Sequence, residues 1–497
     1  MSSLSADLRA IARRAMIQRG LVPDFPPAVL QEVRALTASG ATLPALAPRT
    51  RDLTDRLWMS VDNETSRDLD QLSVAEPLDD RFTRLSVALA DVDAFVQAGS
   101  AMDGHAGVNT TSVYTPAGVF SMIPEALSTD LTSLNQGQPR LAVVVDMDVD
   151  EDGSVDGVEV SRGLVLNHAR LHYDEVAAWL DGTAPAPHAV SAVRGMDAQV
   201  RLQDRVGRAL KRHRHERGAL SLETTQTRVV VQGERVTGLQ LDGRNRAKEM
   251  IEDFMIAVNT ATASYLERRG LPSIRRVLKA PARWDRIVAI ARRLGEALPE
   301  TPEAHALEQF LLRRRAAAPR TFADLSLAVV KLLGSGEYAV ETPGRDLEGH
   351  FGLAVRDYAH STAPNRRFAD LVTHRLLKSA LSREPAPYDA SDLEALARQC
   401  TEQGSNAGKV ERQVRKSAAA MLVAPRIGDT FDAIVTGASA KGTYVRLERP
   451  PVEGRVVDGF AGFDVGDRVR VELVATDVEQ GFIDFRGRGE APRGEAR

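Results

Sequence analysis

The chain has 497 residues, 43% of them hydrophobic and 27% charged, the balance of a soluble globular protein of two to four domains. Its net charge is only −4, from 64 basic and 68 acidic residues, so a nucleic-acid partner would need a local basic surface. A single cysteine, Cys400, excludes an intramolecular disulfide, and the lack of a signal peptide or a long apolar run leads us to expect a cytoplasmic protein without membrane contact.

Residues 1–48 predict a small helical N-terminal domain. Apolar residues recur at helical spacing in SADLRAIARRAMIQRG, and Pro26-Pro27 precede a second segment of the same kind. A simple helical cap and a nucleic-acid-binding helix-turn-helix both fit this pattern.

Residues 49–385 predict one large α+β domain. Strand-like runs at 84–92, 140–149 and 227–241 mix with helical segments at 195–217, 246–267 and 367–381. The acidic turn at 150–153 contains a glycine and fits a hairpin between two strands.

The remainder predicts a helical connection over 386–424, then a small all-β barrel of the OB-fold type over 425–488. Four or five short strands with glycines at the turns favour such a barrel. Residues 489–497 read as a tail. The fold class is therefore α+β and multidomain.

A carboxylate cluster carries the strongest chemical signal. Asp62 follows the strand-like run LWMSVD, and Asp68 and Asp70 lie two residues apart after a polar segment. Three such carboxylates repel one another unless a hard cation lies among them, and magnesium with water and phosphate suits that role. A merely solvated acidic loop is the alternative, whereas an EF-hand fits poorly because its glycine and final glutamate are missing.

These aspartates resemble the signature of the RNase II / RNase R exoribonucleases, the RNB domain family, in which four aspartates in the pattern D-x5-D-x-D-D bind magnesium. The chain departs from that pattern at the fourth position, which is Gln71. An amide can ligate a metal or orient a water but brings no charge. The segments 89–106, 111–137, 244–266 and 350–381 resemble further family blocks in the family's order. The resemblance covers roughly residues 50–385 and implies an RNB-type catalytic domain.

The resemblance also implies roles for residues outside the acidic loop. Arg366, in a turn that leads into a helix, matches the arginine that engages the reacting phosphate, and Tyr114 matches the aromatic that stacks on the 3′-terminal base. Glu252, or its neighbour on the same helix, matches an acidic residue near the terminal nucleotide. His360 and Arg367, beside Arg366, are expected to bind RNA as well.

Two further RNA-binding surfaces are expected. Lys211 and Arg214 belong to a dense basic helix face, which either contacts phosphate or is simply solvated. The barrel sequence resembles the RNA-binding OB-fold repeated in a large ribosomal protein, with Phe431 and Tyr444 as stacking candidates that could equally belong to the barrel core.

The combined prediction is a 3′→5′ hydrolytic exoribonuclease that degrades single-stranded RNA processively to nucleoside 5′-monophosphates. Asp62, Asp68 and Asp70 would hold Mg²⁺, with Mn²⁺ as a substitute, Gln71 assisting and no other small-molecule cofactor. We expect a monomer. A catalytically weakened RNB scaffold that binds RNA is the main alternative, and a DNA exonuclease is less favoured.

Overall fold

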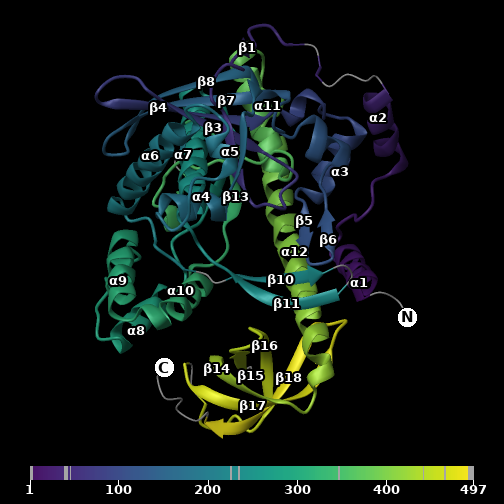
Figure 1. The fold of residues 1–497 in the computed structure, drawn as a ribbon, viewed down its shortest axis with the longest axis vertical. Helices are drawn as coiled ribbons and strands as arrows, with labels where there is room; N and C mark the ends of the chain where they lie inside the picture. Colours follow the sequence, from purple (N-terminus) through teal and green to yellow (C-terminus); the bar gives the residue numbers. More distant parts are fainter. Residues whose placement is uncertain are drawn as a thin grey trace.

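The computed structural model describes residues 4–38, 43–44, 46–223, 226–232, 235–344, 347–439, 442–463 and 466–490. Figure 1 shows a large α+β body, a β-barrel at the opposite end of the molecule, and one long helix, α12, between them. This architecture confirms the predicted fold class. From residue 491 onward, the expected tail lies outside the described residues.

A seven-stranded mixed sheet forms the centre of the body, in the order β1-β8-β7-β4-β3-β2-β9. The outer pairs, β1 with β8 and β9 with β2, are parallel, and the inner pairs are antiparallel. Strands β4 and β7 are largely buried, as their apolar runs predict. The strands are β1 (Arg51–Asp52), β2 (Met59–Asp62), β3 (Gln71–Pro77), β4 (Phe82–Ala90), β7 (Pro139–Asp150), β8 (Val155–Leu166) and β9 (Ala169–His172).

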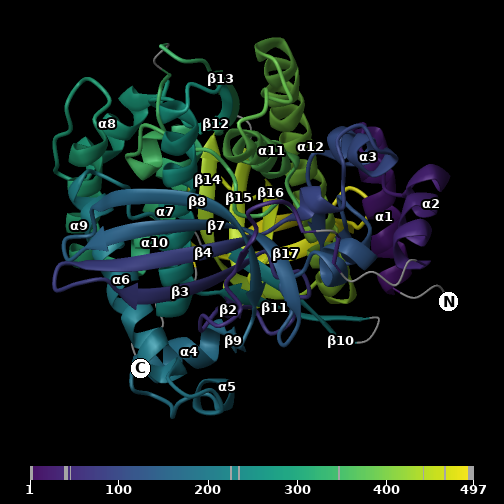
Figure 2. The same cartoon turned by 90° about the horizontal axis from the view of Figure 1, so that it is seen from above.

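Helices lie behind this sheet and beside it, as Figure 2 shows from above. Long α6 and α7 pack on each other and against the sheet, which is why their apolar residues recur at helical spacing. Their bounds confirm the predicted helices. The body helices are α3 (Ala101–Asn109), α4 (Tyr173–Leu180), α5 (His188–Ser191), α6 (Met196–Glu216), α7 (Arg246–Arg268) and α11 (Phe368–Ser382), with short η1 (Val92–Ala94), η2 (Leu127–Leu131) and η3 (Phe351–Leu353).

The predicted hairpin turn at 150–153 joins β7 to β8 and rests on α6. Gly153 has φ +89°, and a Cβ there would lie 2.2 Å from the carbonyl oxygen of Ala209. Only glycine allows both the left-handed backbone and this close approach.

Smaller elements surround the body. A helical subdomain has its own apolar core around Trp284, Phe310 and Phe322. Three two-stranded sheets complete the fold. The helices are α8 (Trp284–Arg293), α9 (Ala304–Ala317) and α10 (Pro319–Leu333), and the strands are β5 (Val113–Thr115), β6 (Gly118–Phe120), β10 (Gln226–Gln232), β11 (Arg235–Asp242), β12 (Ser273–Val277) and β13 (Glu337–Glu341).

The two N-terminal helices, α1 (Leu4–Gln18) and α2 (Pro27–Ala38), pack on different neighbours. The apolar face of α1 lies along α12, whereas α2 meets α3, where Glu32 accepts backbone hydrogen bonds from the first turn. The predicted helices are present, and their separate packing gives no support to a helix-turn-helix. No helix among the described residues has the length and apolar character that a membrane crossing requires.

Helix α12 (Ala390–Val423) begins with a capping box at Asp389 and ends, through η4 (Ala424–Arg426), in the barrel, whose core includes Ala420 and Val423. The barrel is closed, in the order β14-β15-β16-β18-β17, as predicted. Its strands are β14 (Thr430–Ser439), β15 (Gly442–Leu447), β16 (Glu453–Asp458), β17 (Arg468–Asp477) and β18 (Phe482–Glu490).

Candidate active site

The three predicted aspartates lie at one end of the central sheet. Asp62 is the last residue of β2, and Asp68 and Asp70 belong to the loop that leads into β3. Arg170, on neighbouring β9, donates to the backbone carbonyls of Glu64 and Ser66 at 3.1 and 2.6 Å, which holds the loop in its curled form. The chain therefore brings the first aspartate back toward the other two, as the sequence predicts.

Asp62 and Asp70 are carboxylates in an unfavourable environment. Burial, with the charges of Asp70 and Asp68, raises the pKa of Asp62 to about 7. Burial likewise raises the pKa of Asp70 to about 6, although the nearby cation of Arg366 opposes the shift. The Oδ2 atom of Asp62 and the Oδ1 atom of Asp70 are buried without a hydrogen-bond partner.

Other buried acids of this protein have a cationic partner. Lys378 Nζ lies 2.8 Å from Asp91, and Arg246 makes two contacts of 2.7 Å with Asp204. Asp62, in contrast, has no hydrogen bond or ion pair with any described residue. A buried carboxylate is costly unless it is fully paired, and the arginines near Asp62 and Asp70 offset the cost of their burial only in part.

The donor set fits a hard divalent cation. Carboxylate oxygens suit Mg²⁺ or Mn²⁺, and the orphaned oxygens of Asp62 and Asp70 are free for such a ligand. Among the described residues, the one group of three ligand side chains with ligand atoms within 4.8 Å of one another lies elsewhere, at Glu267, Glu341 and Asp357. The wider spread of the three aspartates suits an ion that keeps water and phosphate oxygens as ligands, as Mg²⁺ does.

Arg366 and Tyr114 both reach the aspartates. Arg366 Nε lies 3.2 Å from Asp70 Oδ2, while 41% of its side chain remains exposed, so the guanidinium can also contact a ligand. The hydroxyl of Tyr114 donates to Asp68 Oδ2 at 3.2 Å. Burial and the charge of Asp68 raise the pKa of this phenol, which stays neutral.

Two contacts at the site were not predicted from the sequence. Glu411, on α12, accepts a hydrogen bond of 2.9 Å from the backbone N–H of Tyr114. Tyr173, the first residue of α4, lies close enough to Asp62 that this charge adds to burial in raising its pKa. Neither residue has a local motif. The only signal for Tyr173 is its place directly after a strand that ends beside β2.

Gln71 is the first residue of β3 and pairs in register with Leu89 of β4. Its side chain is half-buried and makes no hydrogen bond to any described residue. The amide is therefore available at the rim of the acidic loop and is not committed to a structural partner.

His360 and Arg367 line a cavity of about 710 Å³ between α12 and the segment before β13. Arg276, Lys409 and Arg412 also line it, which makes this wall cationic. The hydroxyl of Tyr338 lies 2.7 Å from His360 Nδ1, and burial together with the nearby arginines holds the pKa of His360 well below its usual value. The wall of this cavity therefore combines a neutral imidazole with several cations, of which Arg367 is paired with Asp370 at 2.6 Å.

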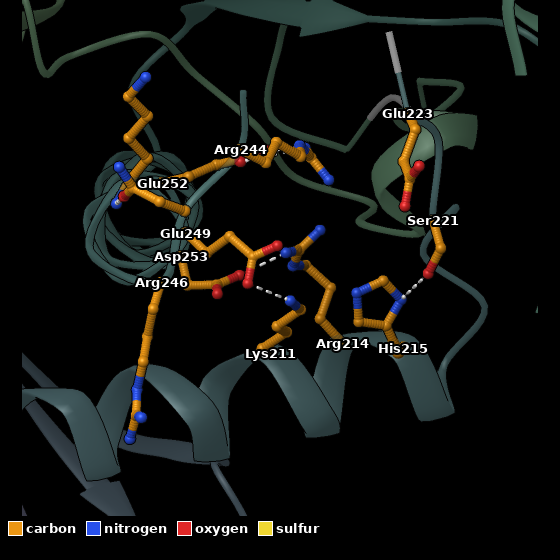
Figure 3. A network of polar contacts seen from close by, with 12 residues as sticks. Lys211, Arg214, His215, Ser221, Glu223, Arg244, Arg246, Glu249, Glu252 and Asp253 are labelled. Carbon is orange, nitrogen blue, oxygen red and sulfur yellow. Dashed lines mark hydrogen bonds and ion pairs between the residues drawn. The ribbon is translucent and has the colours of Figure 1, made fainter. Parts of the chain in front are cut away.

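Lys211, with Arg244 and Glu249, lines a larger cavity of about 990 Å³ between α6 and α7, whereas Arg214 lines a different cavity of about 340 Å³ and Glu252 lines neither. Figure 3 shows that the basic face of α6 points toward acidic residues of α7. Lys211 Nζ lies 2.7 Å from Glu249, and Arg214 forms a buried ion pair with Asp253. Arg244 pairs with Glu252 at 3.2 Å. Because these cations already have carboxylate partners, they are less available to RNA phosphates. This applies most to Arg214, whose ion pair is buried.

The two barrel residues expected to stack on RNA differ in their exposure. Phe431 is only 6% exposed and belongs to the barrel core, so the expectation that it stacks on RNA is wrong and its core alternative holds. Tyr444, 44% exposed on β15, remains available and lies opposite Arg455 of β16.

Clustered carboxylates with unpartnered buried oxygens, a partly exposed arginine and an aromatic ring define a class of site suited to a divalent metal and a phosphodiester. Comparison with known sequences agrees with this class. Residues 50–383 match the RNB domain, and residues 429–487 match the RNase II-type exonuclease C-terminal S1 domain. The chain belongs to the RNB-domain exoribonuclease family, which confirms the resemblance seen in its sequence.

Its relatives include ribonuclease R of Vibrio parahaemolyticus, 29% identical over 93% of this chain, and ribonuclease R of Aquifex aeolicus, 29% identical over 96% of it. Ribonuclease R of Escherichia coli is 28% identical over 93% of it. The chain spans 58%, 70% and 60% of these three relatives.

Solved structures share the fold. RNase R of Mycoplasma genitalium in complex with ribose methylated single-stranded RNA has a TM-score of 0.87 at 22% identity, covering 98% of this chain and 78% of that one. The same enzyme with double-stranded RNA gives 0.85 at 23% identity, covering 98% and 83%. Yeast Ssd1, described as a pseudonuclease, gives 0.65 at 16% identity, covering 88% and 53%.

Proposed function

We propose that this protein is a 3′→5′ exoribonuclease that hydrolyses single-stranded RNA processively to nucleoside 5′-monophosphates, as a monomer in the cytoplasm. The observation that carries the proposal is the pair of carboxylates Asp62 and Asp70, each with one buried oxygen that has no hydrogen-bond partner, beside the partly exposed Arg366. Relatives named ribonuclease R, and structures of one such enzyme described with single- and double-stranded RNA, support RNA as the substrate.

Asp62, Asp68 and Asp70 would hold magnesium, or manganese in its place, and Gln71 would assist. When bound, the metal would neutralise charge on the reacting phosphate and lower the pKa of a bound water. In the hydrolytic step, water adds to the phosphorus and the bond to the 3′ oxygen of the preceding nucleotide breaks. The proton goes to that leaving oxygen, and the released nucleotide keeps its 5′-phosphate.

The protein's own side chains orient this reaction. Arg366 offers the free edge of its guanidinium to the non-bridging phosphate oxygens, where negative charge accumulates in the transition state. Tyr114 presents its ring to the 3′-terminal base, and its bond to Asp68 fixes the ring relative to the acidic site. Because every base has a π-face, such stacking is independent of sequence.

Upstream nucleotides would lie along the cationic wall at Arg367 and His360, while Tyr444 of the barrel captures the strand. Lys211, which lines the larger cavity, and Glu252, which pairs with Arg244 of that cavity, stay candidates for RNA contact because both side chains remain partly exposed.

The alternative function is an RNA-binding protein that has lost turnover. The observation in its favour is Gln71, which removes one charge from the acidic set, and one protein of related fold is described as a pseudonuclease. Three ionisable carboxylates and the free arginine favour the enzyme.

Incubation of the purified protein with 5′-labelled oligo(A) decides between them. With magnesium, we expect the full-length RNA to be converted to a short 5′-labelled end product with few intermediates, as processive degradation from the 3′ end requires, and with a chelator only a bound complex. A DNA oligomer of the same length should remain intact. Binding without shortening at any magnesium or manganese concentration would favour the RNA-binding alternative.

A further inference from the structure

The residue that would stack on the terminal base lies on a very small hairpin. β5 and β6 contain three residues each, and their register pairs Tyr114 with Val119 and Val113 with Phe120. Side chains alternate between the two faces of a strand, so Tyr114 and Val119 are exposed on one face while Val113 and Phe120 are buried on the other. An isolated hairpin of this size is marginal in water. Its position therefore depends on what covers its buried face.

That face is covered by the N-terminal helix together with α12. Val113 and Phe120 share one apolar cluster with α1 and α12, and Figure 1 shows α1 beside both the hairpin and the long helix. The guanidinium of Arg9 lies over the ring of Phe120, 5.3 Å from its centroid. Its Nη1 atom is also 3.3 Å from the point where a Cβ on Gly118 would stand. Arg9 thus contacts both the buried face and the turn of the hairpin. The α1 members of the cluster are Leu8, Ile11, Ala12, Ala15 and Met16.

Helix α1 is itself held firmly. Gln403 and Asn406 of α12 each donate, at 3.2 Å, to the backbone carbonyls of Gly20 and Arg19 after the helix. Arg14 pairs with Glu479 in the turn between β17 and β18 at 2.6 Å. A helix fixed on α12 and on the barrel can transmit a defined position to the hairpin that it supports.

We propose that α1 is a positioning element for the base-stacking site, and that Arg9, over Phe120, holds the hairpin so that Tyr114 stands at Asp68. This inference rests on the proposed role of Tyr114 and extends it to a segment outside the RNB match. Arg9 acts through the hairpin and is not itself a catalytic residue. Its loss should weaken engagement of the RNA 3′ end without slowing the chemical step.

The first test measures the hairpin without RNA. Hydrogen exchange of residues 113–120 should be faster in Arg9→Gln than in wild type, and Arg9→Lys, which keeps the cation, should restore much of the protection. Arg13→Gln is the matched control, because Arg13 lies one turn further along α1 and pairs with Asp24 instead. Equal exchange in Arg9→Gln and Arg13→Gln would overturn the proposal.

The second test measures RNA. Arg9→Gln should raise KM for oligo(A) by about 2- to 5-fold with kcat unchanged, the size of an exposed cation–π contact. In a Tyr114→Ala background, the same substitution should have no further effect on KM, since the base contact is already gone. Fully additive effects of Arg9→Gln and Tyr114→Ala would show that Arg9 does not act through Tyr114.

Different results would contradict the proposed function and the proposed role of α1. A wild type that neither binds nor shortens RNA contradicts the proposed function, whatever the exchange data show. A wild type that shortens RNA and loses affinity in Tyr114→Ala, but is unaffected by Arg9→Gln, contradicts only the role of α1.

Discussion

Replacement of Asp70 by asparagine should make the metal-free protein more stable while it destroys activity. Asp70 is 5% exposed, and its Oδ1 atom has no hydrogen-bond partner. Asparagine keeps the shape and can still accept the hydrogen bond from Arg366, but it removes a charge whose burial Arg366 offsets only in part. The same change removes a ligand from the metal, so hydrolysis should fall by orders of magnitude while RNA binding persists.

The magnitude follows from the pKa. The carboxyl of Asp70 has a pKa of about 6 in the folded protein, against an ordinary value of 3.8. Because the folded pKa is raised, stability is highest below the ordinary value and is lost as pH rises through about 6. The gap between the two values corresponds to about 3 kcal/mol of unfolding free energy. The variant should therefore exceed wild type by up to about 3 kcal/mol above neutral pH, and by almost nothing near pH 4.

Urea unfolding in chelator, at about pH 8 and about pH 4, measures both values for each protein. Magnesium should then stabilise wild type and leave the variant unchanged, because a ligand stabilises only the state that binds it. Asp204→Asn is the matched control: this buried acid pairs with Arg246, so its loss should destabilise. A metal-free Asp70→Asn protein that is less stable than wild type at the higher pH would refute the reasoning.

Three further predictions concern the same machinery. Gln71→Asp should lower the magnesium concentration for half-maximal rate, because it restores a charge to the site; superimposable titrations on one RNA would show that Gln71 does not influence the metal. Magnesium binding, measured by calorimetry, should weaken as pH falls from about 8 to 6. Asp62 and Asp70, with pKa values of about 7 and 6, must release protons to bind the metal. An affinity independent of pH would contradict this prediction. Tyr444→Ala should weaken binding of long RNA, measured by filter binding, by roughly 1–3 kcal/mol without loss of stability. Phe431→Ala should lower the unfolding free energy of the barrel, followed by thermal unfolding, by roughly 3–5 kcal/mol. The reverse pattern would show that Phe431 binds RNA and that Tyr444 belongs to the core.

Much of the fold could be predicted because local patterns determine it. The apolar runs of β4 and β7 and the periodicity of α6 and α7 depend only on neighbouring residues and on a buried face. Elements that exist only through long-range pairing could not be predicted. β1 has two residues and is defined by its pairing with β8, more than 100 positions away. Gln199, on α6, hydrogen-bonds to the backbone of Ala75 in β3, which no helical pattern reveals.

The same division holds for the site. The aspartates are recognisable because they lie within nine positions of one another, whereas Arg366 reaches Asp70 across 296 positions and Glu411 reaches Tyr114 across 297. Only family resemblance could assign Arg366 in advance. For Lys211 and Arg214, the helical pattern correctly gives a basic face but says nothing about what stands opposite it. The structure places α7 carboxylates there.

Charge pairing separates the acids that build this fold from the acids that would bind metal. Asp253 and Asp370 are as deeply buried as Asp70, yet each has an arginine partner, Arg214 and Arg367. Removal of either carboxylate would leave a buried arginine without that partner. Asp62 has no such partner, and Arg366, the partner of Asp70, keeps 41% of its side chain exposed and can also contact a phosphate. The raised pKa values of Asp62 and Asp70 show that their charges are compensated only in part, at a cost of several kcal/mol. Such a cost is understandable where a ligand recovers it, because a divalent cation bound at Asp62 and Asp70 converts their repulsion into affinity.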